Sequence, residues 1–490
     1  MPDHIEKIST APASYMEALV ESDHFTSFIE GTRFQSGSGY LTLCVPFENI
    51  DPLAVLELNG DSSGTRFYWE RPDHEMAISA GNRVALIKST GSNRFETVSA
   101  RARALMSKVH HFSEVNHSMA GAHLVGGFSF FDQPLSGAWS PLGNASFFLP
   151  EWLLVRDGQF SMINITRGWD AGDDPDEIRD WFTSWLRTFL ERLSNKLERS
   201  RILQQDHIQP GKKITRLESN QERMRWINNV EQARGDIHRD LYRKIVIARD
   251  LRLQTADRVS STKLVHYLRR EYPSCYSFIY QLNGEATFLG STPEKLLSLQ
   301  SQYVKTEALA GSMPRGLTAT QDAINEKKLM DSTKDREEHA YVLESIAEKL
   351  HRITDSLEHA PRPVIKKYAN VQHLCTPVAA SLSSDMNAVD IVARLHPTPA
   401  VGGYPESGAL DRIQELEQIE RGWYAGPIGW FNTNRRAEFS VAIRSGLIRR
   451  KHVQFFAGCG IVEDSDPAAE WEETRLKFIP MQKGLEYAIE

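Results

Sequence analysis

The sequence contains few cysteines, four among 490 residues, at positions 44, 275, 375 and 459. Their wide spacing leaves no CxxC pair and no Cys/His cluster of zinc type, and it suggests no dense disulfide framework. No run of about 18 apolar residues occurs, and the first residues have neither the basic segment nor the apolar core of a secretory signal. We therefore expect a cytoplasmic protein that is neither secreted nor membrane-spanning.

Blocks of like charge and nucleotide-binding loops are also missing. The net charge is -7, and no five or six like charges stand together, which argues against nucleic-acid or anionic-membrane partners because both need a positive field. Neither GxGxxG after a strand nor GxxxxGK[ST] occurs, so the common dinucleotide and phosphate cradles have no support. Small anionic substrates remain possible, since a few well-placed cations suffice for them.

Hydrophobic residues make up 41% of the chain and charged residues 25%, proportions typical of a folded globular protein. Between about residues 38 and 165, short apolar runs bounded by Gly, Ser, Asn and Pro predict strands and turns. Apolar residues at three- and four-residue steps from Ile178 to Leu193 predict an amphipathic helix. The polar stretch after it, roughly residues 194–222, is interpreted as a connector, so we divide the chain into residues 1–222 and 223–490.

The densest group of candidate functional residues lies near the C-terminal end, in a segment that predicts a strand, a glycine turn and a helix. Gly458 and Gly460 have no Cβ, so their backbone N–H groups are open to a carboxylate. Glu470, Glu473 and Lys477 fall at i, i+3 and i+7 on one helical face. A solvated helix face with a local Glu473–Lys477 ion pair explains the same charges, so this segment alone does not decide between the two interpretations.

A second acidic helix is predicted after Ser332. It carries Asp335 and Glu338 at i and i+3, followed by His339, which we interpret as a packing or hydrogen-bonding residue. Magnesium prefers oxygen ligands and usually takes one or two protein carboxylates together with waters and substrate oxygens. Two carboxylate-bearing helices that face each other would provide them, but spacing does not show that they do, and ordinary surface charge is the simpler interpretation.

Two charged residues, Lys244 and Glu307, each stand alone within an apolar segment that is predicted to form a strand. An isolated buried charge is costly unless it is paired or neutralised. Burial lowers a lysine pKa and raises a glutamate pKa, so such residues can act as base and acid near neutral pH. A structural ion pair, or a lysine that reaches water, fits the same pattern equally well.

Eight sequence blocks in the second half, in this order, strongly resemble the chorismate-binding enzymes, the family of isochorismate, salicylate, anthranilate and aminodeoxychorismate synthases. The blocks are KIVIAR (244–249), FLGSTPEKL (288–296), TEALAGSMPRG (306–316), KDREEH (334–339), LHPTPAVGG (395–403), RGWYAGPIG (421–429), VAIRS (441–445) and the C-terminal glycine-containing segment. The front half matches more loosely, at GGFSFFD (126–132) and FLP (148–150).

This resemblance implies an α+β fold like that of anthranilate synthase component I, with two large, mainly antiparallel sheets flanked by helices. It also implies chorismate as substrate and Mg²⁺ as cofactor. The carboxylates implied to serve the metal are Glu338 and Glu473, which would approach the ion, and Asp335 and Glu470, which would hold its waters. The residues implied to hold the substrate are Tyr424, Arg444, Lys477, the backbone at Gly458 and Gly460, and His396 beside the ring.

Lys244 decides the expected branch of the family, because water-adding members resemble this sequence in having lysine there, whereas ammonia-using members typically have glutamine. The implied chemistry has Lys244 take a proton from water attacking C2 of chorismate while Glu307 protonates the departing C4 hydroxyl, which yields isochorismate. The long front half favours the menaquinone-type isochorismate synthases. A salicylate synthase, which would also eliminate pyruvate, stays open, and an aminating subunit is disfavoured. We expect no glutaminase partner and a monomer or weak homodimer.

Overall fold

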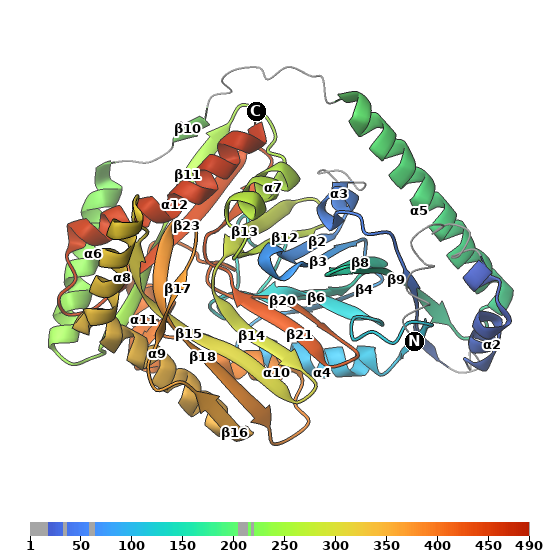
Figure 1. Cartoon of the computed structure of the whole chain (residues 1–490), viewed down its shortest axis with the longest axis horizontal. Coiled ribbons are helices and arrows are strands. Elements are labelled where there is room, and N and C mark those ends of the chain that lie inside the picture. Colours follow the sequence, from blue (N-terminus) through green and yellow to red (C-terminus); the bar gives the residue numbers. More distant parts are fainter. Residues whose placement is uncertain (1–17, 33–36, 58–63, 204–213, 217–219, 490) are drawn as a thin grey trace.

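Two large sheets lie at the centre of the molecule, and helices surround them (Figure 1). The computed structural model describes residues 18–32, 37–57, 64–203, 214–216 and 220–489. Within these residues the first sheet has 13 strands and the second has 10. Pairing is mainly antiparallel, although β1 and β5 run parallel. The expected α+β fold with two large sheets is therefore confirmed.

The strands of the first sheet, in spatial order, are β10 (Ile214–Arg216), β11 (Lys244–Thr255), β23 (His452–Ile461), β22 (Ser445–Arg449), β13 (Ala286–Thr292), β12 (Tyr276–Leu282), β2 (Arg66–Arg71), β3 (Met76–Gly81), β8 (Trp152–Asp157), β9 (Phe160–Asp170), β1 (Ser38–Pro46) and β5 (Val109–Ser113), with β19 (Gly403–Tyr404) beside β11. Those of the second sheet are β16 (Thr354–His359), β18 (Val371–Leu382), β15 (Tyr303–Pro314), β14 (Lys295–Gln300), β21 (Arg436–Val441), β20 (Pro427–Asn432), β6 (His123–Phe128), β7 (Ala145–Leu149) and β4 (Ala85–Ser89), with β17 (Val364–Lys367) beside β18. Residues 1–222 and 223–490 thus contribute strands to both sheets.

The helices are α2 (Asp23–Gly31), α3 (Pro52–Leu56), α4 (Arg94–Met106), α5 (Pro175–Leu203), α6 (Asn220–His238), α7 (Ser261–Glu271), α8 (Ala319–Asp331), α9 (Thr333–His351), α10 (Ala388–Leu395), α11 (Glu406–Leu416) and α12 (Pro467–Ile489). None of the described helices is both long and apolar enough to cross a membrane.

The largest hydrophobic core lies between the two sheets. Trp69 and Phe288 of the first sheet pack in one cluster with Phe147 and Phe439 of the second. A second core covers the other face of the first sheet, where the buried side of α5, including Phe182 and the rest of the predicted amphipathic stripe, lies with α7 and α12. Burying one such large apolar side chain contributes about 1.5–3 kcal/mol, so the helices are fixed to the sheet mainly by this face.

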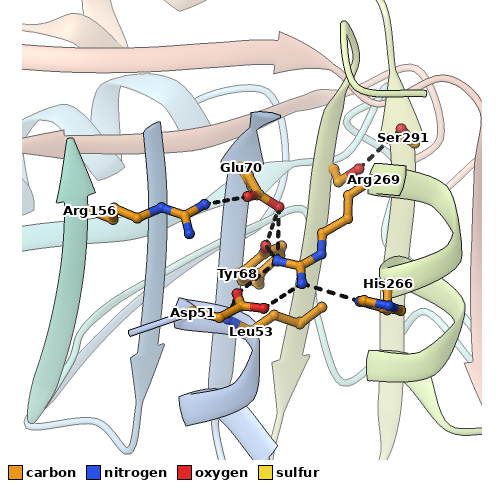
Figure 2. Close-up of polar contacts among 9 residues, drawn as sticks. Asp51, Leu53, Tyr68, Glu70, Arg156, His266, Arg269 and Ser291 are labelled. Carbon is orange, nitrogen blue, oxygen red and sulfur yellow. Dashed lines mark hydrogen bonds and ion pairs between the residues drawn. The ribbon is translucent and has the colours of Figure 1, made fainter. Parts of the chain in front are cut away.

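A buried charge network joins the front half of the chain to the second half. Figure 2 shows Arg269, from α7, between Asp51 at the start of α3 and Glu70 of β2. The Arg269 guanidinium donates to Oδ1 of Asp51 over 2.7 Å and to the Tyr68 hydroxyl over 3.1 Å. On the other side, Arg156 of β8 donates to Oε1 of Glu70 over 2.8 Å. Arg269 thereby links elements that are about two hundred residues apart in the sequence.

The polar stretch 194–222 includes the end of α5, which continues to Leu203, and the start of α6 at Asn220. Its interpretation as a connector stays a prediction, because residues 204–213 and 217–219 lie outside the described chain. One sequence-based expectation of local structure is wrong: no glycine turn occurs at this point of the described chain, since Gly458 and Gly460 lie inside β23, paired with Ala248 and Val246 of β11. The glycines mark a close approach of other groups to the strand rather than a reversal of the chain.

Candidate active site

A cavity of about 250 Å³ opens between α9, α12, β15 and the end of β23. Nine of the twelve predicted site residues line it, namely Asp335, Glu338, Tyr424, Arg444, Gly458, Gly460, Glu470, Glu473 and Lys477. The three that do not are Lys244, Glu307 and His396. Most of the predicted residues therefore gather at one cavity, and their roles in catalysis and binding stay predictions.

The two acidic helices do face each other across this cavity. α9 begins where the Ser332 hydroxyl accepts a hydrogen bond from the backbone N–H of Asp335 over 3.2 Å, a typical N-cap. Its first turn also lies close to β15, because Gly311 has a φ of 72° and a Cβ there would lie 3.0 Å from Cβ of Asp335. These local features direct the α9 carboxylates towards α12.

Each of three carboxylates at the cavity has a lysine as its partner. Nζ of Lys244 lies 2.7 Å from Oε1 of Glu338, and Nζ of Lys477 lies 2.5 Å from Oε1 of Glu473. The third pair crosses from α9 to α12, with Nζ of Lys334 3.8 Å from Oε1 of Glu470. The local Glu473–Lys477 pair that the sequence suggested is therefore present, but it lies at the cavity.

The pKa shifts of the acidic residues reflect both burial and these neighbours. Burial and the nearby Glu473 carboxylate raise the pKa of Glu470. Burial would also raise the pKa of Glu473, but Lys477 outweighs it and holds that pKa below its ordinary value. Burial, reinforced by Glu338, raises the pKa of Asp335. Such crowding of carboxylates favours a bound cation.

The carboxylates suit a hard divalent cation chemically, although they are not gathered around one point. Within the described residues, no group of three or more His, Cys, Asp or Glu side chains is arranged to hold a metal ion. Magnesium needs only one or two protein carboxylates, with waters and substrate oxygens in the other positions. The donor set on α9 and α12 therefore fits magnesium, provided that side chains leave their lysine partners.

Lys244 is the first residue of β11 and is completely buried. It lies against the wall of the cavity, because a Cβ on the cavity-lining Gly460 would be 3.0 Å from Cε of Lys244 and 3.1 Å from Oε1 of Glu338. A glycine at position 460 thus leaves room for the Lys244–Glu338 pair. Lys244 is close to the cavity even though its side chain does not line it.

Glu307 does not line the cavity and forms an ion pair of its own. Its Oε1 lies 2.6 Å from Nζ of Lys366 on β17, and Glu307 itself lies on β15. A carboxyl that the sequence interpretation did not include, that of Glu294 just before β14, also lines the cavity; it is buried and accepts a hydrogen bond from the Thr398 hydroxyl over 3.3 Å. Burial raises the pKa of Glu294 to about 7. Glu294 is therefore a second candidate proton donor at the cavity, and the role expected of Glu307 stays a prediction.

His396 also lies apart from the cavity. It follows α10, and its Nε2 lies 3.1 Å from the carbonyl oxygen of Phe130. The histidine at the cavity is instead His373 of β18, whose Nδ1 lies 3.1 Å from the Gly311 carbonyl oxygen. The same Nδ1 lies 2.9 Å from the Ser312 hydroxyl oxygen, and the buried Nε2 has no hydrogen-bond partner in the described structure. Burial lowers the pKa of His373 to about 3, so the ring is neutral.

Sequence reasoning missed both Glu294 and His373. Glu294 stands within the block of residues 288–296 that carried the family resemblance, but its position beside Pro293 gave no sign of burial. His373 is a single histidine in an apolar strand, a pattern that is usually a packed core residue. Only the pairing of β18 with β15 brings it to the bulge between Ala310 and Ser312.

Two residues are arranged to bind an anion. Arg444 lies in the connection between β21 and β22 with a φ of 50°, and its guanidinium has no hydrogen-bond or ion-pair partner among the described side chains. The ring of Tyr424 stacks on Phe456 at 5.3 Å between centroids, which holds its hydroxyl at the cavity. Because an unpaired, half-buried guanidinium is costly, a ligand carboxylate is its natural partner.

The family model described as "Chorismate binding enzyme" matches residues 27–486. The chain therefore belongs to the chorismate-binding enzyme family, as its sequence blocks indicated.

Individual relatives show which members of the family this chain is similar to. "Isochorismate synthase MenF" of Bacillus subtilis (strain 168) is 31% identical over 445 residues, which cover 89% of this chain and 92% of that protein. The "Salicylate biosynthesis isochorismate synthase" of Pseudomonas aeruginosa is 32% identical over 440 residues, covering 89% and 88%. The solved structure of MenF, the menaquinone-specific isochorismate synthase from Escherichia coli, matches with a TM-score of 0.73 at 24% identity, covering 94% of this chain and 99% of that one. Anthranilate synthase component I from Streptococcus pneumoniae matches with a TM-score of 0.63 at 22% identity, over 83% and 92%. These two structures support the fold.

Proposed function

We propose that this protein is an isochorismate synthase that converts chorismate to isochorismate. The observation that carries the proposal is the meeting of three features at one cavity: a buried lysine, a buried carboxyl with a pKa of about 7, and an unpaired arginine. These supply a base, an acid and an anchor for an anion. The relatives named isochorismate synthase, which align over about nine tenths of the chain, support the same assignment.

In this proposal Lys244, as the neutral amine, accepts a proton from the water that attacks C2 of chorismate. Glu294, rather than the Glu307 expected from the sequence, gives its proton to the departing C4 hydroxyl, which leaves as water while the ring double bond shifts. One water enters and one leaves, so the product is an isomer of the substrate. A positioned acid or base typically contributes about 10²–10⁴-fold to the rate.

Binding relies on the two carboxylates of the substrate. Arg444 and the Tyr424 hydroxyl are placed to hold one of them, and Lys477 lies within the same wall. Glu338 and Glu473 would hold a magnesium ion, with Asp335 and Glu470 on its waters. When bound, the ion would neutralise the other substrate carboxylate and fix its orientation.

The metabolic role is a further part of the proposal. The long front half and the similarity to menaquinone-type relatives favour menaquinone synthesis, and four buried, unpaired cysteines suit a reducing cytoplasm.

Incubation of the purified protein with chorismate, with and without Mg²⁺, tests the assignment when the products are separated by chromatography. We expect isochorismate alone, formed only with the metal. Salicylate and pyruvate appearing directly would assign the protein to the salicylate synthases instead. A product that requires ammonia would contradict both.

A further inference from the structure

The lysine partners of the cavity carboxylates each contact one of the oxygens that a metal ion could bind. Glu338 and Glu473, the carboxylates assigned above to magnesium, lie 2.7 Å from Lys244 and 2.5 Å from Lys477. A magnesium ion binds oxygens at about 2.0–2.1 Å and tolerates little distortion. A lysine ammonium at the same carboxylate would repel the magnesium ion. Metal binding at these residues is therefore an exchange, in which an ammonium group gives up its carboxylate.

The three lysines differ in the solvent access and hydrogen-bond partners that they would keep after such an exchange. Lys334 has 44% of its side chain exposed and can turn to water. Lys477 keeps a hydrogen bond, over 2.8 Å, to the Gly458 carbonyl oxygen. Lys244 has 1% of its side chain exposed, and Glu338 is the only ion-pair partner of its ammonium in the described part of the chain. The Lys244–Glu338 pair is thus the one whose opening matters most.

We propose that Lys244 and the divalent metal ion compete for Glu338, so that metal binding releases the Lys244 ammonium from the carboxylate. This inference rests on the proposed function, because it takes Glu338 as a metal ligand. It makes Lys244 a determinant of metal affinity as well as a reacting group.

The competition predicts that removing the lysine strengthens metal binding. We would measure the dissociation constant of Mn²⁺ for the full chain without chorismate, by electron paramagnetic resonance of the free ion. Lys244→Gln, which keeps a polar side chain without the charge, is expected to bind Mn²⁺ about tenfold more tightly than the wild type. Lys327→Gln, on the exposed face of α8, is the matched control and should leave the affinity unchanged. Equal or weaker binding by Lys244→Gln would overturn the proposal.

A second measurement does not depend on the folding of that variant. In a crystal of the wild-type protein grown with Mn²⁺, we expect Glu338 to contact the ion and Nζ of Lys244 to lie beyond 4 Å from its oxygens. A Mn²⁺-bound Glu338 that keeps Lys244 at its present distance would refute the competition. Turnover of chorismate by the wild type is assayed separately, so a failed competition leaves the proposed function standing. Conversely, metal binding without isochorismate formation would contradict the proposed function but not the competition between Lys244 and the metal ion.

Discussion

The hydroxyl of Thr398 donates to Oε1 of Glu294 over 3.3 Å, and no other hydrogen bond within the described chain reaches that carboxyl. Burial is therefore the largest influence on it and raises the pKa of Glu294 to about 7. Glu307 has a different environment, because the Lys366 ammonium lies 2.6 Å from its Oε1. One carboxyl can hold a proton near neutral pH at the cavity, whereas the other forms an ion pair away from it.

This difference predicts unequal effects of two matched substitutions. Glu294→Gln removes the proton donor while keeping the shape of the side chain, so kcat/KM for chorismate should fall by about 10²–10⁴-fold. Glu307→Gln keeps a hydrogen-bond acceptor for Lys366 and should cost less than about tenfold. Steady-state kinetics of both purified variants make the comparison. The reverse order of effects would restore Glu307 as the acid.

The raised pKa of Glu294 also predicts how activity and stability depend on pH. An acid with a pKa of about 7 is lost as the pH rises, so kcat/KM should fall above about pH 7. The folded-state pKa lies above the ordinary value of 4.5, so the stabilising contribution is complete below pH 4.5 and disappears as the pH rises through 7. Urea denaturation should accordingly show Glu294→Gln to be more stable than the wild type at pH 8 by up to about 3 kcal/mol. A stability difference that does not grow with pH would contradict this account.

Arg444 should act mainly on substrate binding. Arg444→Gln removes the unpaired guanidinium from the cavity, and we expect KM for chorismate to rise at least tenfold, because a charge-assisted hydrogen bond contributes about 1.5–3 kcal/mol. Arg449→Gln, on an exposed position of β22, should leave KM unchanged. A KM that stays constant in Arg444→Gln would show that another cation anchors the substrate.

The two acidic helices beside the cavity could be predicted from local sequence. The spacing of Glu470, Glu473 and Lys477 placed them on one helical face, and Ser332 marked the start of the second acidic helix. These features depend on residues three or four positions apart, which the sequence displays directly. The family blocks supplied the two-sheet fold, which spacing alone could not.

What the sequence could not provide depends on residues that meet only in the folded chain. Glu294 and Glu307 are both single acids in strand-like text, and their roles separate only because Lys366 of β17 reaches one and Thr398 reaches the other. His373 comes to the cavity through a strand bulge. The lysine partner of Glu338 comes from β11, almost one hundred residues away in sequence.

The network around Arg269 predicts a loss of stability far from the cavity. Arg269→Met leaves Asp51 and Glu70 without their shared cation; because the Asp51 side chain is 37% exposed and Glu70 keeps its pair with Arg156, we expect a loss of about 1–3 kcal/mol. Arg270→Met, at the neighbouring exposed position, should change the free energy of unfolding by no more than about 0.5 kcal/mol. Urea denaturation of the two variants compares them. Similar effects would mean that the network contributes little beyond its packing.

The space beside Gly460 predicts a variant that folds but works poorly. A Cβ in Gly460→Ala would meet Cε of Lys244 at 3.0 Å and Oε1 of Glu338 at 3.1 Å. Both atoms belong to the ends of flexible side chains, so they can move by a few tenths of an ångström, and the fold should survive. The base and the metal-binding carboxylate would be displaced, and because misplacement of about 1 Å can cost 10²-fold, we expect turnover to fall at least tenfold. Gly235→Ala in α6 has nothing within 4 Å of the added Cβ and should keep full activity with slightly higher stability. Full activity in Gly460→Ala would show that the position of the Lys244–Glu338 pair does not limit the reaction.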